Sequence, residues 1–248
     1  MNQSIYDNQI FFDGYKALRD RDDNYNVLLE QPAMAERLPD LTGKRVLDLG
    51  CGYGCNCLDF VRRGAERVVG VDLSVKMLEE ARLHASHPKI EYRRMDMADL
   101  SGLDETFDLI YSSLAVHYVE DFVRLAKEFY RLLADGGQLL FSQEHPIITA
   151  TIDGKGHFNF DESGNRVSYT FSDYGRSGRR EIEWFVDGVV KYHRTFGEII
   201  TALAHAGLVV QEVNEPLPKA WAIEKLPSIA KEYIKTNFML VKAVRPEE

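Results

Sequence analysis

The sequence has few cysteines, fewer basic than acidic residues and no long apolar run. Its three cysteines, Cys51, Cys55 and Cys57, are odd in number, which argues against a disulfide framework and predicts a reducing, cytoplasmic setting. The C-x3-C-x-C spacing lacks a second cluster or a nearby histidine, so we expect small buried side chains and no metal site. We also expect no secretory leader and no membrane span, because Met1–Asp13 is polar and aromatic and no segment approaches the roughly 20 apolar residues of a membrane helix.

The charge balance argues against one class of partner. There are 30 Lys and Arg against 39 Asp and Glu, a formal net charge of −9. Binding to nucleic-acid backbones needs clustered basic residues, and the notable cluster here is Arg176, Arg179 and Arg180. We therefore expect no nucleic-acid partner. The 248 residues, 45% hydrophobic, fit one α/β domain with an insertion, as a monomer or homodimer.

Strand and helix patterns alternate along the middle of the chain. Short apolar runs bounded by turn residues predict buried parallel strands, and i, i+3, i+4 apolar spacing predicts helices. Strands are expected at 45–50, 67–72, 89–95, 106–112, 138–143, 208–213 and 237–244, and helices at 55–63, after the N-cap Ser74, at 122–133 and at 195–206. This order predicts an α/β fold: a Rossmann-like, seven-stranded, mostly parallel sheet with helices on both faces and an antiparallel last strand.

Two segments depart from the alternation. Residues 1–40 carry aromatic side chains among charges, and we expect a helical cap over the sheet's carboxyl edge. Residues 145–194, after the fifth strand, are aromatic and glycine-rich, and Asp187-Gly188 between two β-like runs predicts an antiparallel hairpin turn. We interpret 145–194 as an insertion or lid that contributes to a substrate site, and 41–144 with 195–248 as the ligand-binding domain.

The most informative segment is VLDLGCGYG at Val46–Gly54, between the first strand and the first helix. Its glycines permit a sharp turn and a close approach to a ligand, and ligands of open α/β sheets bind at this edge. Asp72 ends the second strand, where a carboxylate can accept hydrogen bonds from ribose hydroxyls. The G-x-G-x-G spacing differs from the dinucleotide pattern G-x-G-x-x-G, and Asp48 suits an ammonium group better than a pyrophosphate.

VLDLGCGYG resembles the first motif of class I S-adenosylmethionine-dependent methyltransferases, of the small-molecule, type 11-like kind. Other family motifs follow in order: VGVDLS at Val69–Ser74, MDMADL at Met95–Leu100, FDLIYSSLAVH at Phe107–His117 and LLADGGQLL at Leu132–Leu140. The resemblance covers about residues 40 to 145. It implies a Rossmann-like fold and S-adenosylmethionine as the cofactor, with S-adenosylhomocysteine as the product.

The resemblance also implies roles for individual residues. Gly50, Cys51 and Gly52 would line the methionine portion, with Asp48 orienting its amino group and Ser112 or Ser113 approaching it. Asp72 would hold the ribose, Leu73 and Met77 would pack near the adenine, and Asp96 and Met97 would contact its ring. Core packing is an equal alternative for Met77. Tyr25, from the N-terminal cap, is a further expected cofactor contact.

Methyl transfer from a sulfonium needs a base only if the acceptor must lose a proton. Candidate bases are His117, His145 and His193, each with the alternative of a hydrogen-bonded structural histidine. The aromatic side chains of the insertion are consistent with a hydrophobic or planar small-molecule acceptor, methylated on O, N or C, and the alternative is that they form the insertion's own small core. Open alternatives are a nicotinamide-dependent oxidoreductase, a non-catalytic S-adenosylmethionine-binding protein, and a nucleic-acid or protein methyltransferase.

Overall fold

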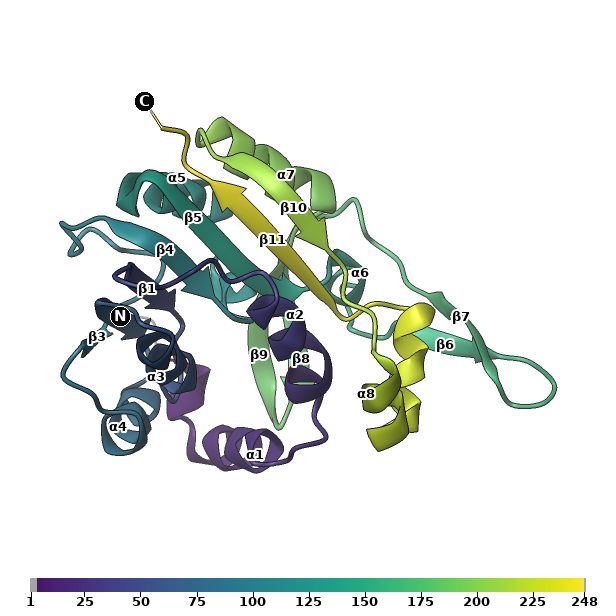
Figure 1. Ribbon diagram of the computed structural model, residues 1–248. Helices are drawn as coiled ribbons and strands as arrows, with labels where there is room; N and C mark the ends of the chain where they lie inside the picture. The colour runs from purple at the N-terminus through teal and green to yellow at the C-terminus, as the bar shows by residue number, and fades with distance from the viewer. Residues whose placement is uncertain (1–3, 248) are drawn as a thin grey trace.

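A seven-stranded sheet forms the centre of the computed structural model, which describes residues 4–247 (Figure 1). The strand order is β10-β11-β5-β4-β1-β2-β3. The strands are β1 (Arg45–Leu49), β2 (Arg67–Asp72), β3 (Ile90–Arg94), β4 (Phe107–Ser112), β5 (Leu133–Glu144), β10 (Val209–Asn214) and β11 (Phe238–Val244). Neighbouring strands pair in parallel from β3 through β5, and β11 runs antiparallel to both β5 and β10. The predicted mostly parallel, Rossmann-like sheet with an antiparallel last strand is confirmed.

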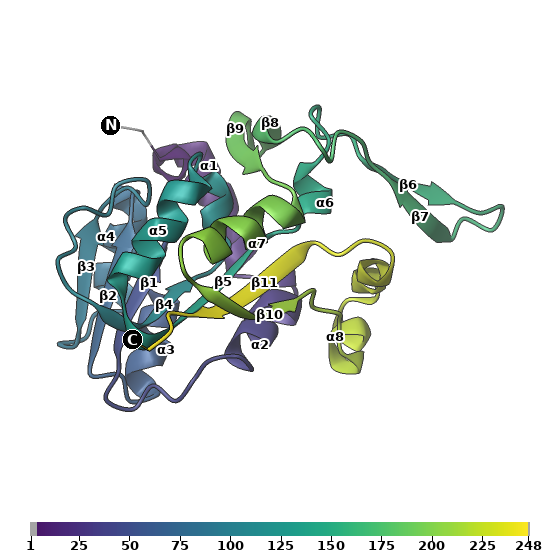
Figure 2. The same ribbon diagram turned by 90° about the horizontal axis from the view of Figure 1, so that it is seen from above.

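Helices cover both faces of this sheet. They are α1 (Gln9–Arg19), α2 (Gln31–Ala35), α3 (Cys55–Arg62), α4 (Val75–His84), α5 (Phe122–Leu132), α6 (Pro146–Thr149), α7 (Phe196–His205) and α8 (Ala220–Lys225), with the short turns η1 (Ile5–Asp7), η2 (Asn26–Glu30), η3 (Val116–Tyr118) and η4 (Pro227–Tyr233). One buried core joins α5 and α7 to the sheet, and a second joins η2, α2 and α3 to its other face (Figure 2). No described helix combines the length and apolarity required to cross a membrane.

Local sequence signals explain where the central helices start. The Ser74 hydroxyl accepts a hydrogen bond from the Met77 N–H, so the predicted N-cap of α4 is confirmed. Thr195 and Glu198 form a reciprocal capping box at the start of α7. The apolar stripe of α5 is buried from Phe122 to Leu132. The caps therefore determine where α4 and α7 begin, and the apolar stripe buries one side of α5.

Three local expectations were inaccurate. The strand expected at 138–143 begins earlier, because β5 starts at Leu133 directly after α5. The helices α8 and η4 lie in a stretch for which no element was expected. The predicted hairpin turn at Asp187-Gly188 is wrong: Trp184 pairs with Val186, so the chain turns at Phe185, whose φ is 58°. The physical reason is the packing of the aromatic tip, described below.

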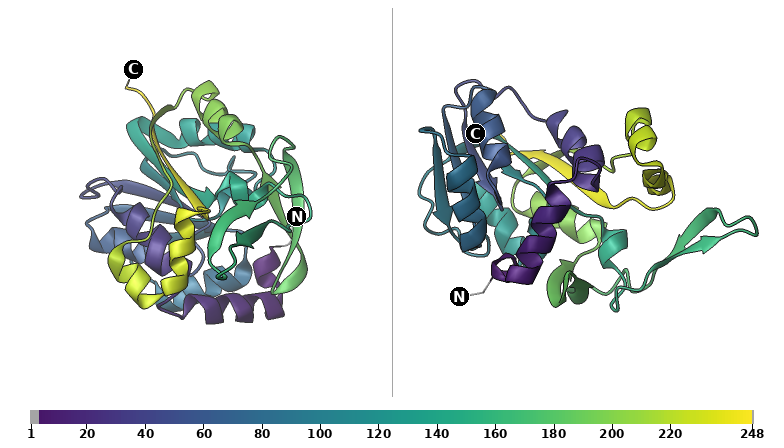
Figure 3. Two further views of the ribbon diagram at one scale, coloured as in Figure 1. Left: turned by 90° about the vertical axis from the view of Figure 1, so that its right-hand side faces the viewer. Right: turned by 90° about the horizontal axis from the view of Figure 1, so that it is seen from below.

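The insertion forms two hairpins with different positions. Strands β6 (His157–Phe160) and β7 (Arg166–Thr170) extend away from the body of the molecule (Figure 1). Strands β8 (Gly178–Trp184) and β9 (Val186–His193) lie beside α1 when the molecule is viewed from below (Figure 3). The Trp184 and Phe185 rings pack edge-on against Phe11, with ring centroids 5.2 and 5.6 Å apart. This contact joins the insertion to the N-terminal cap.

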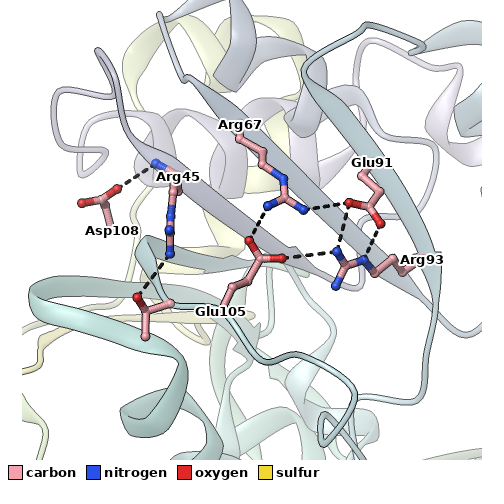
Figure 4. Close-up of polar contacts among 7 residues, drawn as sticks. Arg45, Arg67, Glu91, Arg93, Glu105 and Asp108 are labelled. Carbon is pink, nitrogen blue, oxygen red and sulfur yellow. Dashed lines mark hydrogen bonds and ion pairs between the residues drawn. The ribbon is translucent and has the colours of Figure 1, made fainter.

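A charged network joins the start of β2 to β3 and to the loop before β4, and Arg45 at the start of β1 separately bonds Thr106 and Asp108 (Figure 4). Arg67 pairs with Glu105 at 2.5 Å and Glu91 at 2.8 Å, and Arg93 pairs with the same two carboxylates at 3.2 and 2.6 Å. Hydrogen bonds from Arg93 and Arg67 lower the pKa of Glu91 to about 2. Charges on β3 also protect this edge strand from pairing with another chain.

Candidate active site

A cavity of about 460 Å³ lies where the glycine loop, the carboxyl edge of the sheet, the N-terminal cap and the β8–β9 hairpin meet. Its volume is within the usual range of small-ligand pockets, roughly 300–1,000 Å³. The described residues that line it are Ser4, Ile5, Tyr6, Tyr15, Gly50, Gly52, Val71, Asp72, Leu73, Met77, Met95, Asp96, Met97, Ser113, Leu114, Ala115, Tyr118, Val119, Arg179, Gly188, Val190 and Tyr192.

The glycine loop is held in a turn that a larger residue could not adopt. Gly50 has a φ of 74°, and a Cβ built on it would lie 2.4 Å from the Ala115 Cβ. The N–H groups of Gly50 and Cys51 both donate to the Val71 carbonyl, at 2.8 and 3.0 Å. The loop is therefore fastened to the end of β2 and pressed against the turn after β4.

The Asp72 carboxylate also holds the glycine loop in place. One carboxylate oxygen accepts from the Gly52 N–H at 2.9 Å and the other from the Ser74 N–H at 2.8 Å. Burial raises the pKa of Asp72, while these backbone N–H groups lower it. Each oxygen keeps a further lone pair that can accept from a hydroxyl in the pocket. The carboxylate can thus bind a diol and set the shape of the glycine loop.

Several residues expected to bind cofactor do line the cavity. They are Gly50, Gly52, Asp72, Leu73, Met77, Asp96, Met97 and Ser113. Met77 is both a core residue and a lining residue, since it is 2% exposed. The Asp96 carboxylate caps the loop after β3 by accepting from the Ala98 N–H at 2.9 Å. The structure brings these residues together from four separate segments of the chain.

Four other expected cofactor contacts lie outside the lining. Asp48 is fully buried beneath the loop, where burial raises its pKa to about 7 and the Cys57 thiol donates to it. Cys51 points into the same buried layer, and the Ser112 hydroxyl donates to the Leu49 carbonyl at 2.7 Å. Tyr25 packs in the second core beneath Lys231, whose Nζ lies 5.2 Å from the ring centroid. Their side chains support the site from below.

The three candidate bases also lie behind the pocket wall. His117 is buried, accepts from the Glu144 N–H at 3.4 Å, and has its pKa lowered to about 4 by burial. His145 bonds Glu215 at 2.8 Å, and His193 bonds Thr149 at 2.8 Å and the Tyr174 carbonyl at 2.9 Å. Burial lowers the pKa of His145 and of His193 as well. The structure gives each imidazole hydrogen-bond partners in the protein and does not bring them to the cavity.

The lining also contains tyrosines for which the sequence suggested no individual site role. Tyr6 and Tyr15 come from the N-terminal cap, Tyr118 from η3 and Tyr192 from β9. The Tyr6 and Tyr118 hydroxyls lie 3.2 Å apart, and burial raises the pKa of both phenols. The aromatic composition of both flanking segments was the available signal. Of the insertion's aromatic residues, Tyr192 is the one that reaches the lining.

The cysteines hold no metal arrangement in the part of the chain that the structure describes. All three are free thiols, with Cys51 and Cys57 buried and Cys55 exposed. Among residues 4–247, no group of three or more His, Cys, Asp or Glu side chains is placed to hold a metal ion.

Comparison with known proteins indicates which ligand binds at the carboxyl edge of the sheet. The profile of the family described as "Methyltransferase domain" matches residues 47–141. A crystal structure of an S-adenosylmethionine-dependent methyltransferase from Mesorhizobium loti superposes with a TM-score of 0.80 and 39% identity, covering 87% of this chain and 97% of that one.

Two sequence relatives extend the comparison. An uncharacterized protein of Haemophilus influenzae is 37% identical over 220 residues, 86% of each chain. The ubiquinone biosynthesis O-methyltransferase of Alkalilimnicola ehrlichii is 38% identical over 112 residues, 44% of this chain and 45% of that relative. These matches support a methyltransferase over the nicotinamide-dependent and non-catalytic alternatives. The chain belongs to the class I S-adenosylmethionine-dependent methyltransferases, and it is an enzyme whose cofactor is S-adenosylmethionine.

Proposed function

We propose that the enzyme transfers the methyl group of S-adenosylmethionine to a small-molecule acceptor held in the tyrosine-lined half of the cavity. The observation that carries this proposal is the continuity of the cavity. One space of about 460 Å³ joins the expected cofactor residues, such as Asp72 and Asp96, to Tyr6, Tyr118 and Tyr192. A shared space is what direct displacement between two bound reactants requires.

The cavity divides by chemistry. On the cofactor side, the Asp72 carboxylate would hold the ribose hydroxyls, and Asp96 with Met97 would contact the adenine. Gly50, Gly52 and Ser113 would meet the amino-acid portion. On the acceptor side stand phenol hydroxyls and the apolar Val190 and Val119. This amphipathic surface supports an acceptor with an apolar or planar body and a few polar groups.

The N-terminal cap and part of the insertion close the acceptor side. The cap contributes Tyr6 and Tyr15, and the hairpin β8–β9 contributes Arg179, Val190 and Tyr192. The outer hairpin β6–β7 contributes none of the described lining residues. The lid proposed for residues 145–194 is therefore the β8–β9 hairpin.

S-adenosylmethionine supplies an electrophilic methyl group on a sulfonium, which leaves as a neutral thioether. The protein's task is to align the acceptor's nucleophile with the methyl–sulfur axis and to exclude water. A phenol is protonated at neutral pH, and burial raises the pKa of Tyr6 and Tyr118 further, so both hydroxyls would orient the acceptor as neutral hydrogen-bonding groups. Because His117, His145 and His193 do not line the cavity, none of them is placed to act as a base on the acceptor. This arrangement favours a nucleophile that carries a free lone pair, such as an amine, over one that needs a protein base.

The proposal is tested by the fate of a labelled methyl group. The enzyme is incubated with methyl-labelled S-adenosylmethionine and a cell extract that is separated into small-molecule, protein and nucleic-acid fractions. We expect the label to accumulate in a small molecule that separates chromatographically from S-adenosylmethionine, and a Tyr6→Phe/Tyr118→Phe double variant to slow this accumulation. Label found only in protein or nucleic acid would overturn the small-molecule assignment.

A further inference from the structure

Glu30 is a buried acid at the centre of the carboxyl edge of the sheet. It ends the π-helical turn η2 and is 0% exposed. One of its oxygens, Oε1, accepts from the Ser142 hydroxyl at 2.5 Å and from the Ser113 hydroxyl at 2.8 Å. Among the described residues, its other oxygen, Oε2, has no hydrogen-bond partner. The N-terminal cap therefore places one carboxylate against the ends of both β4 and β5.

The turn that Glu30 holds is strained and lines the cavity. Leu114 has a φ of 51°, in the left-handed region, which is strained for a residue with a side chain. Its N–H donates to the Ser142 hydroxyl at 3.0 Å and carbonyl at 3.1 Å. Ser113, Leu114 and Ala115 all line the cavity, and Ala115 meets Gly50 of the glycine loop. Strain of this kind persists where surrounding contacts over-determine the backbone, and it clusters at functional sites.

The charge of Glu30 is not matched within the described part of the chain. No Lys, Arg or His nitrogen of those residues forms an ion pair with it within 4.0 Å. Burial raises its pKa, while the two serine hydroxyls and the more distant Arg19 lower it. Short hydrogen bonds from two hydroxyls to one oxygen are typical of a charged acceptor. Buried charges in proteins are usually paired, so a cation bound in the adjoining cavity would supply a partner for this carboxylate.

We propose that Glu30, acting through Ser113, is the positioning residue that supplies the counter-charge for the ammonium group of the cofactor's amino-acid portion. This inference depends on the proposed placement of that portion beside Gly50, Gly52 and Ser113. Asp48, the acid expected from the sequence to serve this group, lies in the buried layer below the loop and is bonded to the Cys57 thiol, whereas Glu30 is bonded to Ser113, which lines the cavity.

The test compares two ligands that differ in the group concerned. S-adenosylhomocysteine carries the amino-acid portion, and 5′-methylthioadenosine lacks it while keeping the adenosine and the thioether. Both are titrated calorimetrically into the whole protein and into Glu30→Gln. We expect Glu30→Gln to weaken S-adenosylhomocysteine binding about tenfold or more, the loss of one charge-assisted interaction, and to leave 5′-methylthioadenosine within about twofold.

Matched variants separate this role from a structural one. Glu232→Gln removes a second buried acid, 2% exposed and bonded to Asn237, and it should change neither affinity. Ser113→Ala breaks the link between Glu30 and the cavity and should reproduce the selective loss even if Glu30→Gln fails to fold. Equal weakening of both ligands, or an unchanged affinity ratio in Ser113→Ala, would overturn the proposal. Failure of the unmodified protein to bind either ligand would instead refute the proposed cofactor placement.

Discussion

Asp72 illustrates how one side chain serves both structure and binding. Its two oxygens accept from the Gly52 N–H in the glycine loop and from the Ser74 N–H at the N-cap of α4. The sequence predicted its position at the end of β2, because strand ends and glycine turns are short-range features. It did not predict the bond to Gly52, which depends on how two neighbouring strands come into register.

Replacing Asp72 should weaken cofactor binding without unfolding the sheet. In Asp72→Ala the ribose loses hydrogen bonds to a charged acceptor, each worth about 1.5–3 kcal/mol, so S-adenosylhomocysteine affinity should fall at least tenfold. Calorimetric titration measures the change. Asp99→Ala, which removes an acid outside the lining, serves as the control, and equal affinities in the two variants would contradict the assigned role.

His117 should make stability depend on pH. Its folded pKa, about 4, lies below the ordinary value of 6.5, so the unfolded chain binds more protons between these values. Stability should therefore fall as pH drops from about 6.5 to 4, by up to a few kcal/mol for this residue. Burial lowers the pKa of His145 and His193 in the same direction, so they add to the loss.

Urea unfolding at pH 7 and pH 5 measures this dependence. The difference in unfolding free energy between the two pH values should shrink in His117→Gln. It should persist in His84→Gln, because the His84 side chain is 71% exposed. An unchanged pH dependence in His117→Gln would show that the imidazole is not held neutral.

At the scale of elements, the β8–β9 hairpin shows the limit of local sequence signals. Asp187-Gly188 is a strong turn dipeptide, yet the chain turns at Phe185 and Gly188 lies within β9. The tip gains contact with Phe11 and Tyr15 of α1, some 170 residues earlier in the chain. Such long-range aromatic packing offsets the left-handed strain at Phe185 and is invisible to a local pattern. The central strands, in contrast, follow from their apolar runs alone.

Gly14→Ala tests the contact between this hairpin and α1. A Cβ at Gly14 would lie 2.7 Å from the Phe185 ring, so the ring must move, although alanine favours the helix itself by about 1 kcal/mol. The chain has two tryptophans, so Trp184 is the one that remains in a Trp221→Phe background. In that background we expect Gly14→Ala to shift the Trp184 fluorescence to the red, because the indole becomes more exposed.

Gly175→Ala provides the control for that substitution. A Cβ at Gly175 would meet no atom within 4 Å, and its backbone is not left-handed. Its Trp184 emission should match that of the background protein. Identical spectra for Gly14→Ala and Gly175→Ala would mean that the hairpin tip does not rest on α1 in solution.

At the scale of the whole molecule, the cavity is an assembly of segments far apart in the chain. The motifs between Val46 and Leu140 predicted the family, the fold and the cofactor edge, because each is contiguous and they follow in order. The acceptor side could not be predicted in the same way. It requires the N-terminal cap and the insertion to meet over the sheet, bringing Tyr6 within hydrogen-bond distance of Tyr118. The direction of the three histidine side chains away from the cavity is likewise a tertiary outcome.

A crystal structure of the enzyme with S-adenosylhomocysteine tests the central claim most directly. We expect the ribose hydroxyls within hydrogen-bond distance of Asp72 and the adenine beside Asp96 and Met97. The amino-acid portion should lie against Gly50 and Ser113, with the thioether sulfur open toward Tyr6 and Tyr118. A product molecule bound elsewhere, or one whose sulfur is separated from the tyrosines by the wall of the cavity, would contradict the account.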